Sequence, residues 1–388
     1  MKTDYEYVVL GLGGFGSAAA YWLARRAGAE VLGVEQFELG HVRGESQDHS
    51  RIIRLSYHTP GYVELAKHAF RAWHEVEQES GEQLILRTGG LDFGPRVSAI
   101  PLSNYADSMA AAAVPYETLD AGEIMRRWPA FRLGDNIHGL FQEQGGIAKA
   151  AQANAVHQRL ARAHGATLRD RVEVGAVHPE RGEIGIELNG VTVRCRQLII
   201  TAGAWSNRIL SPFGIRLPLT ITQEQVTYFD SPRPELFQPQ RFPVWIWMDD
   251  PCFYGFPVFG EAGPKVGQDA GGKEVTADTR TFDPDAAALQ RVRDFLARYI
   301  PDALGPIIYT KTCLYTLTPD RDFVIDRVPG QSGAWIAIGG GHGFKFASLV
   351  GKILAQLATE GRTPHDLTAF RIDREILQLE NPPKHYMV

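Results

Sequence analysis

The chain has 388 residues, of which 44% are hydrophobic and 22% charged, and this size and composition predict a globular protein with about two domains. Its Lys and Arg residues number 40 against 45 Asp and Glu, and the net charge of −5 argues against general binding to nucleic acids or anionic membranes. The sequence has no apolar run of transmembrane length and no signal peptide pattern at its N-terminus, so we expect a cytoplasmic protein.

The first predicted elements form a β-α-β unit. Residues 5–10 are a short apolar run before a glycine cluster, which predicts a buried strand. Residues 17–27 are rich in Ala, Leu and Arg and predict a helix that Gly28 ends. Residues 30–35 then predict a second strand.

Elements of two different kinds follow along the chain. Residues 217–267 combine alternating and aromatic residues with repeated Pro and Gly, which is typical of an antiparallel sheet. The other predicted elements are helices at 62–81, 148–165, 283–299 and 346–359, and strands within 167–186, 196–201 and 335–338.

The loop after the first strand carries the most specific local motif. Residues 11–16 read Gly-Leu-Gly-Gly-Phe-Gly and fit GxGxxG. The first glycine of such a loop permits a tight turn, the second lets the backbone approach a pyrophosphate, and the third lets helix and strand pack closely. Glu35 ends the next predicted strand, where an acid accepts hydrogen bonds from an adenosine ribose. The motif predicts a dinucleotide but does not separate NAD from FAD.

Four further motifs separate these cofactors. They are HSRIIR at 49–54, AGAWS at 202–206, CLYTLTPD at 313–320 and GHGFKF at 341–346. In this order they resemble the monomeric sarcosine oxidase family, which includes N-methyltryptophan oxidase and pipecolate oxidase within the D-amino-acid-oxidase-like flavoproteins. The resemblance spans nearly the whole chain, from Gly11 to about Thr359.

The resemblance implies FAD, attached through its 8α-methyl group to a cysteine that precedes the YTLTPD run. Cys313 occupies that position, and a thiolate is a soft nucleophile suited to forming the thioether. A lone cysteine is otherwise most often an inert buried residue, which is our interpretation of Cys195 and Cys252; no CxxC spacing predicts a metal site or a disulfide framework. The residues assigned to the cofactor are Gly11, Gly13, Gly14, Phe15, Gly16, Glu35, Gln36, Ser50, Arg51, Val172, Gly203, Trp205, Cys313, Gly341, Gly343, Phe344 and Lys345.

The expected fold is α/β, with an α+β character overall. A Rossmann-like FAD-binding domain is expected to accompany a substrate domain with a mainly antiparallel sheet. The FAD-binding domain is expected to be discontinuous, with residues 1–85, 148–215 and 312–388, and residues 86–147 and 216–311 would form the substrate domain.

The reaction that the resemblance implies is oxidation of a secondary amine on a carboxylate-bearing substrate. A hydride equivalent passes to the flavin, the imine hydrolyses, and oxygen is reduced to hydrogen peroxide. Arg54 and Lys345 match the family positions that hold the carboxylate, Arg as a planar fork and Lys as a point charge. Lys265 matches the lysine whose charge stabilises superoxide as oxygen takes its first electron. Each would otherwise be an ordinary surface cation.

Three more residues match active-site positions of the family. Tyr254 precedes the Gly-Phe-Pro run at 255–257, and Tyr315 follows Cys313 in the covalent-attachment motif. Either tyrosine would otherwise be a core aromatic residue. Arg51 is expected beside the flavin ring, where its charge would favour the anionic reduced flavin.

The sequence also departs from the family pattern. Sarcosine-type members carry a His four residues after the oxygen-activating lysine, where this chain has Asp269, and the two-histidine stretch before RIIR reads Gln-Asp-His at 47–49. The acid would select a cationic or polyhydroxyl substrate, or tune pKa values in the pocket. Trp245 and Trp247 fall where the substrate cavity is expected, although a packed core would also use them. Sarcosine, N-methyltryptophan, pipecolate and fructosyl amino acids therefore all stay compatible substrates.

Three other functions compete with an oxidase. An FAD dehydrogenase would pass electrons to another protein, against which Lys265 argues. A nicotinamide-dependent dehydrogenase would share the glycine loop but has no use for Cys313 or the GHGFK segment. A flavin-binding sensor would require the charged residues to be coincidental. The expected partners are a small secondary amine and O2, with neither nucleic acid nor membrane, and a monomer is the family tendency.

Overall fold

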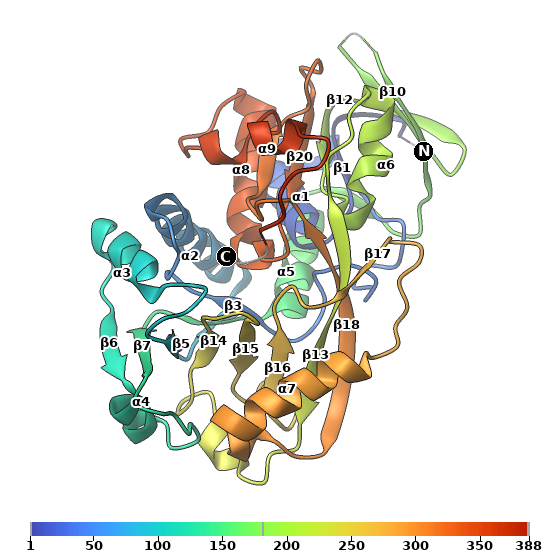
Figure 1. Cartoon of the computed structure of the whole chain (residues 1–388). Coiled ribbons are helices and arrows are strands. Elements are labelled where there is room, and N and C mark those ends of the chain that lie inside the picture. Colours follow the sequence, from blue (N-terminus) through green and yellow to red (C-terminus); the bar gives the residue numbers. More distant parts are fainter. Residues whose placement is uncertain (1, 181, 386–388) are drawn as a thin grey trace.

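The computed structural model describes residues 2–180 and 182–385. Within these ranges the chain forms two large sheets, which lie in the upper and lower parts of Figure 1, and one small sheet. No helix of the described ranges is both long and apolar enough to cross a bilayer.

Parallel strands form the centre of the first large sheet, which has eight strands in the described ranges. Strand β1 (Asp4–Leu10) lies between β2 (Val31–Val34) and β12 (Val191–Ile200). Next to them, β9 (Thr167–Arg169) pairs with β2 and β20 (Ala334–Ile338) pairs with β12, also in parallel. The strands that pair antiparallel are β10 (Val174–Pro179), β11 (Ile184–Leu188) and β19 (Val324–Arg327).

Alternate residues of β1 belong to different cores, because successive side chains of a strand point to opposite faces. Val9 packs on the face covered by α1, whereas Val8 and Leu10 pack with Ile209 and Leu210 on the other face. Helix α1 packs against α5 and α8, and α2 packs against α8. The helices of this part are α1 (Gly14–Ala27), α2 (Pro60–Ser80), α5 (Ala150–Ala163), α6 (Ser206–Leu210), α8 (Ala347–Glu360) and α9 (Glu375–Gln378).

The second large sheet has nine strands in the described ranges, and helix α7 (Ala286–Tyr299) packs against it (Figure 1). Phe295 of α7 contacts the rings of Trp245, Trp247 and Phe253. Strand order is β17-β13-β16-β15-β14-β5-β7-β6, with β18 also paired to β13. The strands are β5 (Gly90–Pro95), β6 (Glu117–Asp120), β7 (Ile137–Gln142), β13 (Thr220–Phe229), β14 (Val244–Trp247), β15 (Phe253–Phe256), β16 (Lys265–Gln268), β17 (Lys273–Val275) and β18 (Ile307–Leu317).

Short elements connect these sheets. The small sheet consists of β3 (Arg51–Ile53), β4 (Ile85–Arg87) and β8 (Gly146–Ala148), and α3 (Leu102–Ala111) and α4 (Ala121–Arg127) lie near β5–β7. The 3₁₀ turns are η1 (Gly28–Glu30), η2 (Gly203–Trp205), η3 (Ser211–Phe213), η4 (Pro234–Phe237), η5 (Pro301–Ala303), η6 (Gly343–Phe346) and η7 (Thr368–Phe370).

The predicted α/β class is confirmed, and several helix boundaries differ from expectation, two of them for a clear physical reason. Helix α1 begins at Gly14 rather than residue 17, because the glycine loop itself forms the first turn. Helix α7 begins at Ala286 rather than 283, because the Asp285 carboxylate caps it by accepting from the N–H groups of Ala287 and Ala288.

The second sheet is mainly antiparallel as predicted, although β14 pairs in parallel with β5. Every strand of the first sheet comes from the pieces 1–85, 148–215 and 312–388. Strand β18 and the small sheet cross the expected boundaries. The exact division into two domains therefore stays a prediction.

Gly351 of α8 allows the closest approach to α1 and gives a test of this packing. A Cβ at Gly351 would lie 2.5 Å from the backbone carbon of Ala18. Gly351→Ala should lower the free energy of unfolding by about 1–3 kcal/mol through overpacking. Gly61→Ala is the matched control, since a Cβ there meets no atom of the described residues within 4 Å. Chemical denaturation measures both, and equal stability of Gly351→Ala and the parent chain would contradict the packing.

Candidate functional site

The glycine loop is held by close backbone contacts that only glycine permits. Gly11 has φ +91° and donates its N–H to the Val34 carbonyl at 2.8 Å, which ties β1 to the end of β2. A Cβ on Gly16 would lie 1.7 Å from the carbonyl oxygen of Gly11. The loop therefore turns sharply and starts α1 with its first N–H groups free of helical partners, which is an arrangement suited to phosphate.

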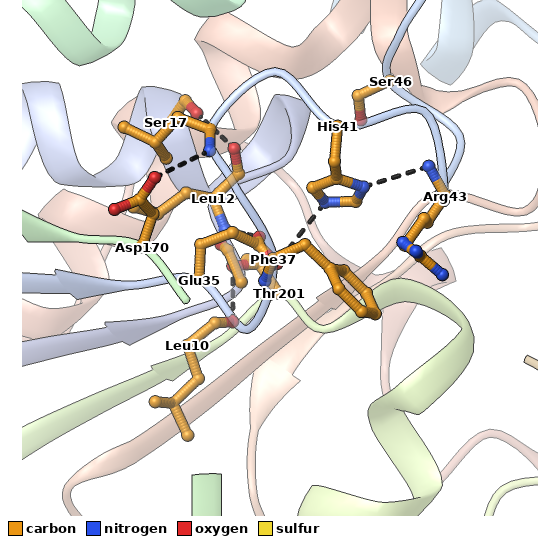
Figure 2. A network of polar contacts seen from close by, with 12 residues as sticks. Leu10, Leu12, Ser17, Glu35, Phe37, His41, Arg43, Ser46, Asp170 and Thr201 are labelled. Atoms are coloured by element: carbon orange, nitrogen blue, oxygen red, sulfur yellow. Dashed lines mark hydrogen bonds and ion pairs between the residues drawn. The ribbon is translucent and has the colours of Figure 1, made fainter. Parts of the chain in front are cut away.

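Glu35 is fixed just beyond β2, beside this loop (Figure 2). Its Oε2 accepts from the N–H of Leu12 at 2.9 Å, and its Oε1 accepts from the N–H of Phe37 at 3.1 Å. The Arg43 N–H donates to Nδ1 of His41, so Nε2 of this ring carries the proton and lies 3.4 Å from Oε1 of Glu35. The carboxylate is thus an ordered acceptor for hydroxyl groups.

One cavity joins this loop to the predicted substrate residues. Its wall includes Ile246, Tyr254 and Phe256 from the second large sheet and the loop after β20. The predicted residues that line it are Gly11, Gly13, Gly14, Phe15, Glu35, Gln36, Arg51, Arg54, Gly203, Trp205, Tyr254, Tyr315, Gly341, Gly343, Phe344 and Lys345. The cavity therefore brings together motifs that are far apart in the chain.

Other predicted residues lie behind this wall. Val172 donates its N–H to the Glu35 carbonyl, and the Ser50 carbonyl accepts from Lys265. Gly16, Ser50, Val172, Lys265 and Cys313 are not among the lining residues, although Leu314 and Tyr315 next to Cys313 are. Trp245 and Trp247 are buried in the core, and Ile246 between them faces the cavity.

Arg54 is held at the cavity by a buried carboxylate. Its Nη1 donates to Oδ1 of Asp92 at 2.9 Å, and its guanidinium lies 5.1 Å from the ring centre of Tyr57. Nε of Arg54 is buried without a partner in the described residues. Burial opposes the charge of Arg54, and Asp92 raises the pKa of the guanidinium above its usual value. The arrangement fixes a charged donor group at the wall.

Lys345 adds a second cation. Its Nζ donates to the His342 carbonyl at 3.0 Å. Burial lowers the pKa of Lys345 well below its usual value, and the Arg54 guanidinium lowers it further, whereas Asp269 raises it. A bound anion would relieve this repulsion, because it would favour the charged form of the lysine.

Asp269 pairs with a residue that sequence reasoning missed. Nη1 of Arg321 donates to Oδ2 of Asp269 at 2.7 Å, and both residues line the cavity. Arg321 is buried and has φ +61°, a strained conformation for a residue with a side chain. The acid at 269 is therefore balanced by a fixed cation within the protein.

Lys265 forms a buried ion pair behind the cavity wall. Its Nζ donates to Oδ2 of Asp48 at 2.9 Å and to the Ser50 carbonyl at 2.8 Å. Burial lowers the pKa of Lys265 to about 8, although the Asp48 carboxylate acts in the opposite direction and Arg51 lowers it further. Despite its burial, Asp48 has a lowered pKa because of Lys265 and Arg51.

The CLYTLTPD segment at 313–320 places Cys313 near the charge of Arg51. Cys313 and Tyr315 are two positions apart on β18 and therefore lie on the same face of the strand. Interaction with Tyr315 acts to lower the pKa of Tyr254, against the larger effect of burial. Burial raises the pKa of the Cys313 thiol to about 11, and the Arg51 guanidinium acts against this rise. Burial also raises the pKa values of both tyrosines, which keeps them neutral donors.

Several lining residues were missed by sequence reasoning: His41, Ser46, Asn154, Arg208, Asp269's partner Arg321 and His342. Ser46 Oγ accepts from the N–H of Gly14 at 2.8 Å, and its carbonyl accepts from Asn154. Residues 41 and 46 lie in a polar stretch without periodicity, and no local pattern marks Asn154, Arg208 or Arg321. His342 lies within the GHGFKF motif, which could have pointed to it. Their roles follow only from the folded arrangement.

The residues present fit a flavin dinucleotide. Gly13 and Gly14 line the cavity without side chains, so a ligand could approach their backbone closely. A Cβ at either position would also lie 3.0 Å from Ser46 or the Phe344 ring. Buried Oδ1 of Asn154 and Nδ1 of His342, both on lining residues, have no partner in the described part of the chain. Such atoms are normally satisfied, and a bound ligand would supply their partners.

Comparison with known proteins identifies the family. Residues 6–357 match the family described as FAD dependent oxidoreductase. The chain belongs to this family. The predicted cofactor FAD is confirmed at the level of the family. The cavity between the glycine loop and the second large sheet is the candidate site of this FAD-dependent oxidoreductase.

Relatives extend over nearly the whole chain of this FAD-dependent oxidoreductase. It is 32% identical to the monomeric sarcosine oxidase of Bacillus sp. (strain NS-129), over 98% of this chain and 99% of the relative. Human peroxisomal sarcosine oxidase is also 32% identical, over 96% of this chain and 97% of the relative. The N-methyl-L-tryptophan oxidase of Salmonella heidelberg is 31% identical, over 95% of this chain and 99% of the relative.

A solved structure has the same fold. NikD, an unusual amino acid oxidase essential for nikkomycin biosynthesis, superposes with a TM-score of 0.85 at 26% identity, covering 96% of this chain and 98% of that one. The predicted resemblance to sarcosine and N-methyltryptophan oxidases is confirmed by the two kinds of comparison together.

Glu35 provides a test of the dinucleotide end of the cavity. Glu35→Gln should weaken FAD binding about tenfold, because one carboxylate oxygen is replaced by an NH2 group facing backbone donors. Binding of FAD to apoprotein is measured by fluorescence quenching in a Cys313→Ala background. Glu38→Gln is the control, since Glu38 is exposed only three residues away. Unchanged affinity in Glu35→Gln would contradict the assigned contact.

Proposed function

We propose that the protein oxidises a secondary amine that carries a carboxylate, with oxygen as the electron acceptor. The product imine would hydrolyse, and oxygen would leave as hydrogen peroxide. The observation that carries this proposal is the placement of Arg54 and Lys345 in the same cavity as the glycine loop. The relatives named for sarcosine and N-methyl-L-tryptophan oxidation support the same substrate class.

The cations would fix the substrate by its carboxylate. Arg54 is anchored by Asp92 through Nη1, so its remaining donors keep a defined direction. Within the described residues, Nζ of Lys345 donates to one backbone carbonyl, which leaves ammonium hydrogens for a ligand. Two cations at one end of the substrate would orient the carbon next to nitrogen, which is the contribution expected of a protein whose cofactor carries the redox chemistry.

FAD, when bound, accepts two electrons from the substrate and passes them to oxygen. Arg51 is held by donating to the carbonyls of Glu45, Gln47 and Ser50, so its charge stays at the cavity wall. A fixed positive charge there would favour negative charge on the reduced ring system. Tyr254 and Tyr315 would border the substrate as neutral hydroxyl groups.

We further propose a thioether between Cys313 and the flavin 8α-carbon. For this bond, the S–H bond of Cys313 and one C–H bond of the methyl group would break and an S–C bond would form, with oxygen taking the two electrons and two protons. Proximity of Cys313 to Arg51 supports this step, because the guanidinium stabilises the thiolate. We also propose that the protein is a monomer and is located in the cytoplasm.

Acid precipitation tests the covalent bond. The yellow colour should stay with the precipitated chain and be released from Cys313→Ala. Cys252→Ala is the matched control and should retain the colour, since Cys252 is also partly buried. Yellow colour that leaves the precipitated parent chain and stays in solution would contradict the thioether. It would not contradict the assignment of FAD as the cofactor.

The carboxylate site is tested by a peroxide-coupled assay over secondary amino acids. Lys345→Gln should raise KM by about 10–100-fold while kcat changes less, because a charge-assisted hydrogen bond is lost equally from ground and transition states. Arg54→Lys, which keeps the charge but loses the fork, should act in the same direction. Lys352→Gln on the outer part of α8 is the control. An equal rise in KM for an amine without a carboxylate would contradict the assignment.

A further inference from the structure

Lys265 lies among three strands and the loop that carries Asp48 and Ser50. It begins β16, where it faces Tyr228 of β13 and Phe256 of β15 in the sheet register. Its Nζ is 4.1 Å from the ring centre of Phe256, a residue that lines the cavity. Lys265 itself is only 2% exposed. Its ammonium group therefore lies one side chain behind the cavity wall and acts on the cavity through its charge.

The side chain of Asp48 is held in place next to the Lys265 ammonium group. Its Oδ2 accepts from Lys265 at 2.9 Å, and its Oδ1 accepts from the Tyr228 hydroxyl at 3.0 Å. The Asp48 side chain is only 3% exposed, and its φ is +130°, where a residue with a Cβ is strained. Such a conformation persists only when its surroundings hold it, and here both carboxylate oxygens are engaged.

A buried lysine beside Arg51 would lose its proton easily without this carboxylate. Burial disfavours the charged form, and the Arg51 guanidinium repels it. Within the described residues, Asp48 is the one carboxylate within 4.0 Å of Lys265 Nζ. The same carboxylate lies 3.8 Å from Arg51, so it balances both cations. Removing it would leave two cations together in a site of low polarity.

We propose that Asp48 is a positioning residue that keeps Lys265 protonated beside the cavity and thereby sets the pH range in which the reduced protein reacts with oxygen. This inference rests on the proposed role of Lys265 in oxygen reduction. If Asp48 instead weakened the effect of the lysine charge, removing the carboxylate would speed up reoxidation by oxygen at neutral pH. The proposal predicts slower reoxidation, so the experiment distinguishes the two effects.

Other ionisable groups face this pair from each neighbouring element. Arg51 lies on the same segment as Asp48, and Tyr228 lies on β13. Lys311 and Cys313 on β18 are within electrostatic range of Asp48 or Lys265. The pair of His49 and Glu261 borders Tyr228. Within the described residues, none of these groups forms an ion pair with Lys265 in addition to the one with Asp48.

The test is the rate of reoxidation by O2 of anaerobically reduced holoprotein, measured by stopped flow across pH. The parent rate should fall as pH rises through about 8, the pKa of Lys265. Asp48→Asn should move this fall to lower pH by about 1–3 units, because an opposite charge within hydrogen-bond distance is lost. The variant should therefore be slower at pH 7, by about twofold for a one-unit shift and about 90-fold for a three-unit shift, and should recover at acid pH.

Three companion variants make the result specific. Asp48→Gly accepts the positive φ without strain and should shift the pH profile in the same direction if the Asn variant folds poorly. Tyr228→Phe removes the other hydrogen bond of Asp48 but keeps its charge, so the parent midpoint should persist. Lys265→Met should be slow at every pH and lack this transition.

A measurement independent of turnover follows the lysine itself. In protein labelled with ¹³Cε-lysine, the NMR signal missing from Lys265→Met should titrate at lower pH in Asp48→Asn than in the parent. An unchanged midpoint in Asp48→Asn, or reoxidation faster than the parent at neutral pH, would overturn the inference. Parent-like reoxidation of Lys265→Met would overturn the proposed oxygen role as well, whereas a slow Lys265→Met with a parent-like Asp48→Asn would overturn the inference alone.

Discussion

Buried positive charge at the inner end of the cavity is the constraint around which the rest of the site is arranged. A buried charge is costly unless it is paired and hydrogen-bonded. Arg54 is paired with Asp92, Arg321 with Asp269, and Lys265 with Asp48. Lys345 has a backbone carbonyl as its hydrogen-bond acceptor. The paired cations are thus stabilised by the protein, whereas Lys345 gains most from an anionic ligand.

The glycine loop lies at the other end of the cavity, where it would bind the phosphates of the cofactor. It places the start of α1 and the carboxylate of Glu35 at one end of the same cavity. A dinucleotide whose phosphates rest on the loop would extend toward Arg51, Tyr254 and Tyr315. Under this proposal the two large sheets would have distinct roles. The first sheet would position the loop that binds the cofactor, and the mainly antiparallel sheet would supply part of the wall around the substrate.

Local sequence patterns predicted the parts of the fold that depend on local physics. The β-α-β unit at residues 5–35 was predictable because apolar runs and glycines mark its strands and turn. The charge pairs were not, because their partners are distant in the chain: Asp48 and Lys265 are 217 positions apart, and Arg321 and Asp269 are 52 apart. The alternating residues 245–247 predicted a strand, but the pattern did not say that both tryptophans would face the core and Ile246 the cavity.

We infer that an isoalloxazine ring occupies the cavity where these cations meet. The absorption spectrum of the purified, undenatured protein, recorded before and after incubation with FAD and gel filtration, tests it most directly. The account predicts the visible bands of a bound flavin at a ratio near one per chain, in the isolated or the reconstituted protein. A colourless protein that takes up no FAD would contradict the account.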